Sequence, residues 1–510
     1  MTRISQTSAL VTPRGDQAAS DRDRRRWLIL AVIAVAQLMV VLDATVVNIA
    51  LPSAQMALHF TDADRQWVVT AYALAFGSLL LLGGKLADLF GRKLTFVTGL
   101  IGFAAASAVG GAASSFGMLV TARACQGAFG ALLAPAALSL LTTTFPDKAE
   151  RGKAFGVYGA IVASGGALGL LLGGVLTEYL SWRWCLYINL FFAVIGVTGA
   201  LLLLRREPPT ERPRLDLPGT VSVCAAMFCL VYGCSNADTH SWHAPSTWGF
   251  LVAGAVLLAV FAALEVHVAD PMLPPRIVLN RNRGASYLAV FLVMAGMAAS
   301  FLFLTYYLQG TLGYSPVTTG LAYLPMLVGA MITGLLSNVV LLRRTGPRLL
   351  VVVGLLLAAA GMVWLTRIGL HSGYVSTLLG PLLITGLGIG LVLAPSMNTA
   401  TFRVPPLDAG VASAMANTQQ QIGLSIGTAL LNTVAVGATA SYLIVNATPA
   451  SINLALVHGY TTAFWWAAAF LAAGALFCGA LFHGGVLPGQ GDSGAPRTPG
   501  ESETASAVGA

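Results

Sequence analysis

The chain has 510 residues, of which 56% are hydrophobic and 9% are charged, and its mean hydropathy is +0.78. A soluble domain carries roughly 25% charged residues, so this composition excludes an ordinary soluble protein and predicts an all-α membrane protein surrounded by lipid. The net charge of +8 is compatible with nucleic acid, but most lysine and arginine residues fall in loops on one expected side of the membrane. That asymmetry follows the positive-inside rule, so we expect no nucleic-acid partner.

Fourteen apolar runs approach the length of about 20 residues that a membrane-spanning helix needs. We expect them at 27–50, 67–83, 94–113, 117–141, 154–177, 184–204, 217–236, 248–268, 285–308, 317–342, 349–368, 375–400, 411–436 and 460–482. The even number, together with the basic segment 22–26 and the basic loops, places both termini in the cytoplasm. Only Arg65, Arg183 and Arg367 fall in loops expected on the outside. The sequence therefore predicts a multi-pass protein of the cell membrane.

Polar linkers divide these spans into groups of six, two and six. The expected units are an N-terminal six-helix bundle at 27–204, linkers with an extra helix pair (217–236 and 248–268) at 205–284, and a C-terminal six-helix bundle at 285–482. The flanking segments 1–26 and 483–510 are polar or rich in Gly, Ser and Pro, and are predicted to be disordered cytoplasmic tails. Two repeated halves around a midplane site are a common build of secondary transporters.

The first expected span contains Asp43, which is the only acidic residue inside the first six spans. A charge at that depth costs about 2.5–3.5 kcal/mol and usually marks an ion or substrate path. A carboxyl group in apolar surroundings can bind and release a proton near neutral pH. The alternative is a structural carboxylate that one arginine neutralises permanently.

Arg123 in the fourth expected span is the predicted partner of Asp43. Counting inward from the outer ends of the two spans at 1.5 Å per residue places both side chains about 10 Å below the outer surface. Arginine stays charged at any working pH, so it can influence the acid without losing its own proton. Arg123, Gln126 and Gly127 share one helix face, where the small residue permits close approach of a neighbouring helix.

Polar side chains also occur in spans outside this pair. The candidates for lining a substrate cavity are Asn48, Tyr306, Tyr307, Asn417, Gln420 and Gln421. Polar groups within spans either bind substrate or join helices to one another, and both interpretations stay open. The sequence has no phosphate-binding G-x-x-x-x-G-K-[ST] loop, no nucleophile elbow and no metal-ligand spacing, so we expect no ATP motor, no enzyme and no cofactor.

The segment GGKLADLFGRK at 83–93 joins the second and third expected spans. Its charges lie between glycines, which allow a tight turn at the membrane surface, and its basic residues place it in the cytoplasm. By charge alone it is an ordinary positive-inside loop. A fainter copy, RRTGPR at 343–348, follows Gly334 in the second half.

Three motifs together resemble the major facilitator superfamily, and in particular its fourteen-helix drug:proton antiporter family of the EmrB/QacA type. They are L-D-x-T-x-V-N-x-A-L-P at 42–52, the 83–93 loop, and R-x-x-Q-G at 123–127. The stretch from Trp182 to Asn189 is similar to a W-R-W…N stretch of the same branch. Helix 154–177 departs from the antiporter motif, because Leu170 stands where proline is expected, although the glycine face is retained.

The resemblance implies a major facilitator fold that exports small amphipathic compounds by proton-coupled alternating access, as a monomer. It implies proton coupling by Asp43, Arg123 and Gln126, and a conformational latch between the halves formed by Gly84, Asp88, Gly91, Arg92 and Lys93. The small-molecule substrate, protons and the lipid bilayer are then the only expected partners. The alternative is a major facilitator that imports or exports one specific metabolite.

Overall fold

The computed structural model of the chain describes residues 14–61, 64–145, 147–204, 217–240, 244–268, 278–402, 404, 409–446, 451–483 and 485. Within those ranges the regular structure is entirely helical, as expected for backbone that has no water to bond with in a bilayer. Eleven of the described helices are long and apolar enough to cross a membrane. Three further helices contain shorter apolar stretches among the described residues: Gln66–Leu80, Leu168–Tyr179 and Pro218–Leu230.

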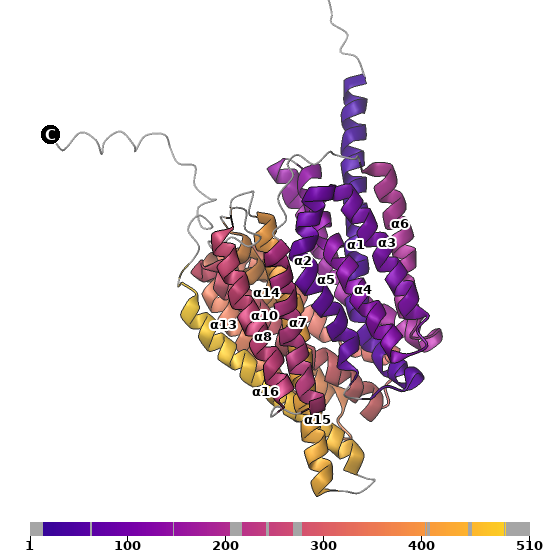
Figure 1. Ribbon diagram of the computed structural model, residues 1–510, viewed down its shortest axis with the longest axis vertical. Coiled ribbons are helices and arrows are strands. Elements are labelled where there is room, and N and C mark those ends of the chain that lie inside the picture. Colours follow the sequence, from indigo (N-terminus) through magenta and orange to yellow (C-terminus); the bar gives the residue numbers. More distant parts are fainter. Residues whose placement is uncertain are drawn as a thin grey trace, which may run out of the picture.

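The first six long helices pack together as one half of the molecule (Figure 1). They are α1 (Arg14–Leu58), α2 (Gln66–Phe90), α3 (Arg92–Gly111), α4 (Phe116–Thr144), α5 (Lys148–Tyr179) and α6 (Trp184–Leu203). α1 begins at Arg14, whereas the sequence predicted a disordered tail over 1–26, so the prediction differs from the structure over 14–26. Arginine is a good helix former, and the helix continues past the apolar run. Residues 1–13 and most of the segment 483–510 lie outside the described residues.

The second half carries breaks within its helices. It comprises α10 (Arg281–Tyr306), η1 (Tyr307–Thr311), α11 (Pro316–Ala322), α12 (Leu324–Leu336), η2 (Ser337–Leu341), α13 (Leu342–Leu365), η3 (Tyr374–Leu379), α14 (Gly380–Thr401), α15 (Ala409–Val445) and α16 (Ile452–Leu481). The η elements are single π-helical turns, a form that often marks functional positions in helices.

The extra pair, α7 (Leu217–His240) and α8 (Pro245–His267), packs as a hairpin against α2 and α15 (Figure 1). Cys224 of α7 donates to the carbonyl of Ser78 in α2, and the ring of Tyr232 lies 5.9 Å from that of Trp67. The pair therefore covers the seam where one helix of each half meets.

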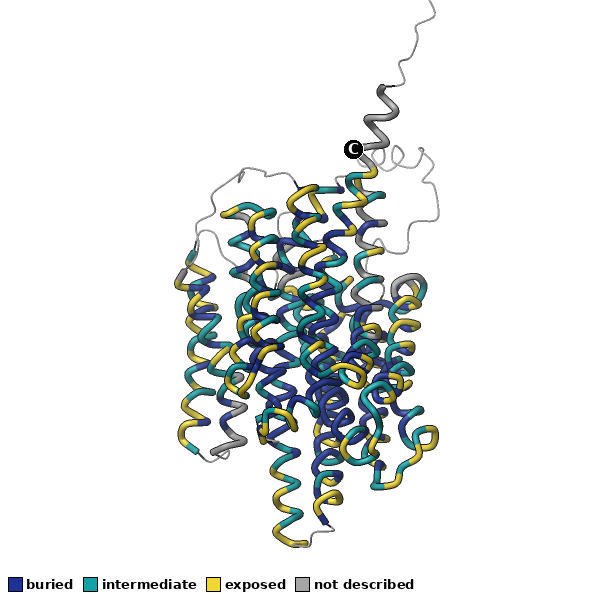
Figure 2. Tube along the Cα trace, turned by 90° about the vertical axis from the view of Figure 1, so that its right-hand side faces the viewer, coloured by how far each residue is buried: buried dark blue, intermediate teal, exposed yellow. Residues whose placement is uncertain are grey.

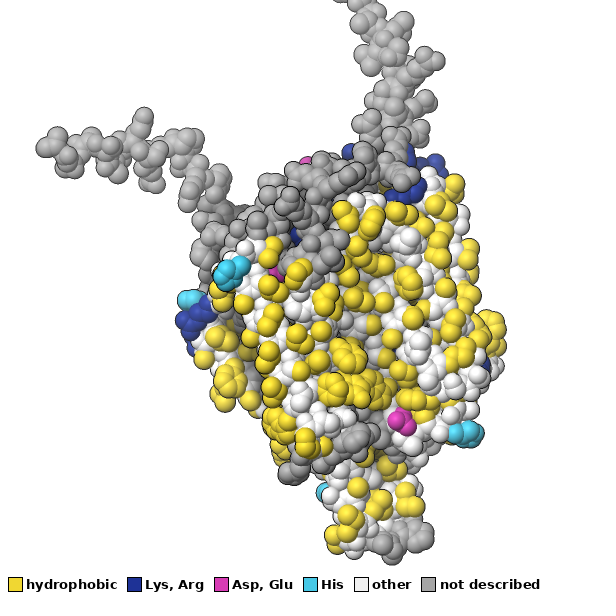
Figure 3. All heavy atoms as spheres, in the orientation of Figure 1, with side chains coloured by type: hydrophobic (Ala, Val, Ile, Leu, Met, Phe, Trp, Pro, Cys, Tyr) yellow, Lys and Arg dark blue, Asp and Glu magenta, His cyan; other side chains and the backbone are white. Residues whose placement is uncertain are grey.

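α1 begins and α16 ends on the same side of the molecule, which we call the termini face; the other side is the opposite face (Figure 1). Exposed apolar side chains cover the surface between them, while most of the lysine and arginine side chains in view lie toward the termini face (Figure 3). This pattern fits a protein whose middle is solvated by lipid and whose basic loops meet water on one side.

Packing between the halves is concentrated toward the opposite face. The largest buried cluster combines residues from the far end of α1, such as Ile49, with residues of α10 and α16, such as Phe303 and Phe464. The other buried clusters each belong to one half, among them the cluster around Phe96 and Phe103 in the first half. Figure 2 shows the buried positions along the helices in dark blue. The halves are therefore joined most closely where the chain is farthest from the termini face.

Two loops on the termini face use glycine in the same way. Gly91 has a φ of 91° between α2 and α3, and Gly346 has a φ of 75° within the stretch assigned to α13. Only glycine adopts such a backbone without strain. The faint sequence echo of the 83–93 loop at 343–348 thus corresponds to a matching backbone turn in the second half.

Candidate functional site

Asp43 and Arg123 form an ion pair in the interior of the first half. Arg123 Nη1 donates to Asp43 Oδ2 at 2.5 Å, across from α4 to α1. Their exposed fractions are 1% for Asp43 and 2% for Arg123. A pair so thoroughly removed from water is costly unless its remaining polar atoms are bonded as well, and the surrounding side chains supply those bonds.

Two side chains, Gln126 and Asn189, complete the bonding of the pair. Gln126 Nε2 donates to Asp43 Oδ1 at 2.9 Å, and Gln126 Oε1 accepts from Arg123 Nη1 at 3.0 Å. Asn189 Nδ2 of α6 donates to the same Oδ1 at 2.7 Å and to Ser107 Oγ of α3 at 2.9 Å. Three helices of the first half, α1, α4 and α6, thus meet at one buried carboxylate, and Asn189 links α3 to it through Ser107.

Asn189 did not stand out in the sequence as a partner of the acid. It ends the stretch that is similar to the W-R-W…N pattern, and the structure places it inside the bundle, where it is fully buried. Among the described residues no donor bonds to Asn189 Oδ1. The amide nitrogen of Asn189 therefore donates to the carboxylate, while its amide oxygen accepts no hydrogen bond from the described residues.

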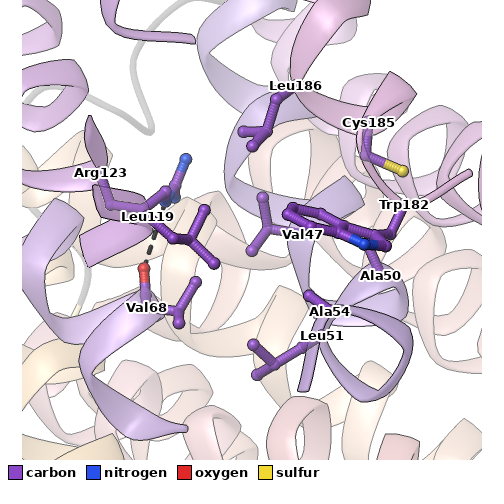
Figure 4. A pocket seen from close by; sticks show the side chains of 10 residues that line it. All are labelled: Val47, Ala50, Leu51, Ala54, Val68, Leu119, Arg123, Trp182, Cys185 and Leu186. Carbon is purple, nitrogen blue, oxygen red and sulfur yellow. Dashed lines mark hydrogen bonds between the residues drawn. The ribbon is translucent and has the colours of Figure 1, made fainter. Parts of the chain in front are cut away.

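Arg123 has further contacts on α2. Its Nε donates to the carbonyl of Val68 at 3.2 Å, and its guanidinium lies 4.4 Å from the ring centre of Tyr72. Beyond Arg123, toward the opposite face, lies a small pocket lined by Leu51, Leu119 and Trp182 among other apolar side chains (Figure 4). The pocket reaches only the arginine edge of the polar cluster, so this side of the carboxylate is shielded by apolar groups.

α1 is packed tightly against α5 on both sides of Asp43. A Cβ on Gly169 would lie 1.9 Å from Thr45 Oγ1, and one on Gly173 would lie 3.0 Å from the carbonyl oxygen of Val46. The glycine face of α5 is therefore required for contact with the helix that carries the acid. Leu170, the departure from the expected proline, is fully buried.

The same helix α5 reaches the second half at the opposite face. A Cβ on Gly174 would lie 2.7 Å from the carbonyl oxygen of Pro316, and Glu178 Oε2 accepts from the backbone N–H of Val317 at 3.0 Å. A Cβ on Gly320 of α11 would likewise lie 2.6 Å from the carbonyl oxygen of Leu170. These contacts join α5 to α11 backbone against backbone.

Arg65, which the sequence predicted to lie in a loop on the outside, is buried in the structure. It immediately precedes α2, is 2% exposed, and its Nε donates to Asn432 Oδ1 of α15 at 3.2 Å. Nearby, Tyr306 donates to Gln55 Oε1 of α1 at 2.5 Å. Side chains from both halves therefore interlock at this level, a feature that periodicity cannot detect because it depends on contacts between distant segments.

The residues of the expected latch contact their own half. Lys93 Nζ donates to the carbonyls of Leu201 and Leu204 at the end of α6, at 3.1 Å and 2.5 Å. Gly91 makes the turn, and Arg92 begins α3. Gly84 faces α4, where an added Cβ would lie 3.7 Å from Pro135. The side chain of Asp88 lies outside the described residues.

The six residues expected to line a cavity do not meet at one place. Asn48 donates to the carbonyl of Ala44 in its own helix. Tyr307 donates to the carbonyl of Gly369 within the second half, whereas Tyr306 faces the first half. Asn417, Gln420 and Gln421 lie in the part of α15 nearer the termini face, and Gln421 lies against Gly77 of α2.

Comparison with known proteins gives the chain a context. The family model described as Major Facilitator Superfamily matches residues 33–428. The chain is 51% identical to the puromycin resistance protein of Streptomyces alboniger over 90% of this chain and 92% of the relative. It is 39% identical to a cephamycin export protein of Amycolatopsis lactamdurans, over 79% and 84% of the two chains. It is 32% identical to the multidrug efflux pump LfrA of Mycolicibacterium smegmatis, over 82% and 83%.

Solved structures agree with this at the level of the fold. A bacterial homologue of the human lysosomal transporter Spinster, in an inward-facing and unoccupied conformation, superposes with a TM-score of 0.62 at 17% identity, covering 90% of this chain and 97% of that one. A peptide transporter of the POT family gives a TM-score of 0.64 at 18% identity, covering 90% and 96%.

Proposed function

Because the chain belongs to the Major Facilitator Superfamily, we propose that it exports small amphipathic drugs or antibiotics across the cell membrane by proton-coupled antiport. The chain is a multi-span membrane transporter, not an enzyme. The direction and the substrate class are supported by the names of its relatives, which refer to resistance, export and efflux. The single observation that supports proton coupling is the fully buried Asp43–Arg123 pair.

In this proposal, Asp43 carries the proton. Its carboxylate accepts bonds from Arg123, Gln126 and Asn189 while it is charged. Protonation removes the charge that holds the arginine and turns one acceptor oxygen into a donor. The acceptor Oδ1 of Asn189 is placed to receive that new O–H after its amide turns over, so the same side chain can bond the acid in both states.

The change at Asp43 must reach the contacts between the halves. Gly169 and Gly173 of α5 pack against α1 at Thr45 and Val46, within one helical turn of Asp43. Gly174 of α5 packs against Pro316 of α11. Close backbone packing transmits a shift instead of absorbing it. We propose that a change in the protonation of Asp43 moves α1 together with α5. This movement changes the contact between α5 and α11 that closes the opposite face. The contact is then the element that switches between two states in alternating access.

The finer architecture belongs to the same proposal. We propose that α2, α5 and α7, which contain the three shorter apolar stretches, also cross the membrane, which gives fourteen spans in the 6+2+6 order of the EmrB/QacA-type family. The proposed units are the bundles at 27–204 and 285–482, joined by 205–284 with its extra pair. The termini face is proposed to be cytoplasmic, as its basic residues favour. The described conformation is then inward-facing, and the 83–93 loop is the latch of the other state.

The competing candidate is a facilitator for one specific metabolite, which would share the fold. The two candidates are distinguished by measuring the efflux of a panel of dyes and antibiotics, including puromycin, from cells with and without the protein. Energy-dependent efflux of several unrelated amphipathic compounds supports drug export. Movement of a single compound, or of none in the panel, contradicts it.

A further inference from the structure

Arg65 enters a buried box of aromatic and amide side chains that belongs entirely to the other half. Its guanidinium lies 4.3 Å from the ring centre of Tyr306, 5.7 Å from that of Phe303 and 5.9 Å from that of Tyr460. Aromatic faces within about 6 Å of a cation attract it, most strongly when water is excluded. We name Phe303, Tyr306, Tyr460 and Asn432 the aromatic box.

The four members of the aromatic box all belong to the second half, and Tyr306 also donates a hydrogen bond to Gln55 of the first half. The four residues come from α10, α15 and α16, and each is at most 9% exposed. The rings of Phe303 and Tyr460 stack on each other at 5.8 Å, and Phe464 packs behind them. Arg65, in contrast, precedes α2 of the first half, so it must leave the box whenever the halves part at the opposite face.

We propose that the aromatic box is a binding site for an organic cation on its way out, and that Arg65 competes with the cation for it. The inference rests on the proposed alternating-access export. When the opposite face opens, the box keeps its shape and its preference for a positive group beside an aromatic surface. When the face closes, Arg65 returns as a tethered competitor, whose effective concentration reaches the millimolar range for a short tether. It displaces the cation and prevents rebinding.

The test is equilibrium binding to the purified full-length protein in nanodiscs, without any gradient. The probe is radiolabelled benzyltrimethylammonium, and neopentylbenzene, which has the same shape without the charge, is the competitor that reports on charge. Arg65→Ala removes the internal competitor, so the probe should bind at least about tenfold more tightly than to the wild type. Arg65→Lys keeps a cation at this position and should bind the probe as weakly as the wild type does.

Two further variants show where the gain arises. Adding Tyr306→Leu to Arg65→Ala should return the affinity to the wild-type value, because the nearest ring is lost. Arg65→Gln is shorter and neutral but keeps an N–H donor at the level of Arg65 Nε, which bonds to Asn432. It replaces Arg65→Ala should that variant fail to run as a monodisperse peak.

The proposal is overturned by equal affinities of wild type and Arg65→Ala, by a gain that persists without Tyr306, or by an equal gain for neopentylbenzene. Because the assay needs no transport, its outcome is separate from that of the proposed function. If the protein exports drugs but Arg65→Ala binds the probe no more tightly than the wild type, only the proposed cation site is contradicted. If Arg65→Ala binds the probe more tightly but the protein exports no compound of the panel, only the proposed drug export is contradicted.

Discussion

Asn189 Nδ2 lies 2.7 Å from Asp43 Oδ1, although 146 positions separate the two residues in the chain. The bond joins α6 to α1 and meets the bond from Gln126 on the same oxygen, while Arg123 holds the other oxygen. The carboxylate is thus bonded on both oxygens without any contribution from the second half. Proton binding at Asp43 can therefore be studied through the stability of the first half as well as through transport.

Replacement of Asn189 by leucine should destabilise the protein through Asp43. A hydrogen bond to a charged group contributes about 1.5–3 kcal/mol, and leucine has nearly the same shape but no donor. The thermal midpoint of Asn189→Leu in detergent should fall clearly, and the fall should be much smaller in an Asp43→Asn background. Equal falls in both backgrounds would show that Asn189 acts only through packing or through Ser107.

Substitutions of Arg123 should separate charge from geometry. Arg123→Ala leaves a buried carboxylate without its counter-charge, which costs about 3–5 kcal/mol, so expression and transport should both fall severely. Arg123→Lys cannot reach Asp43, Gln126 and the Val68 carbonyl together, so transport should fall. Because the lysine keeps the positive charge, the fall should be smaller than in Arg123→Ala. The measurement is drug efflux per unit of protein in the membrane. An alanine variant as active as the lysine variant would contradict a role for the charge.

The sequence predicted the contact between Asp43 and Arg123 for a physical reason. A lone acid and a lone arginine in apolar helices are costly, so each requires a partner, and equal depth identified that partner. The cavity residues carried no such requirement, since a tyrosine or amide can bond within its own helix, as Asn48 does. The burial of Arg65 could not be predicted from the sequence, because it depends on side chains of the second half, more than 230 residues away.

A larger side chain at Gly320 should hold the opposite face open. A Cβ there would lie 2.6 Å from the carbonyl oxygen of Leu170, so Gly320→Val cannot coexist with the close contact of α11 and α5. A cysteine placed at Glu178, in a background without the natural cysteines, should then react faster with a membrane-impermeant thiol reagent. Gly437→Val is the matched control, because nothing lies within 4 Å of its Cβ position. Equal rates for the two variants would mean that α11 is not part of the closure.

The 83–93 loop should show two separable roles. Lys93→Met removes a cap on the end of α6, which contributes about 0.3–1 kcal/mol, so the thermal midpoint should fall slightly. Asp88→Asn should instead lower the transport rate with normal insertion and expression, if the loop is a latch. Unchanged transport in Asp88→Asn would reduce the loop to a topology signal.

The central claim, that Asp43 carries the exchanged proton, is tested most directly in inverted membrane vesicles with an acidic lumen. Puromycin added outside should enter the lumen of vesicles that contain the wild type, and protons should leave it, as an acridine dye reports. Asp43→Asn resembles the protonated acid permanently, so these vesicles should neither release protons nor accumulate puromycin against a gradient. Proton release and accumulation that persist in Asp43→Asn would contradict the account, and would leave Asp43 as a structural partner of Arg123.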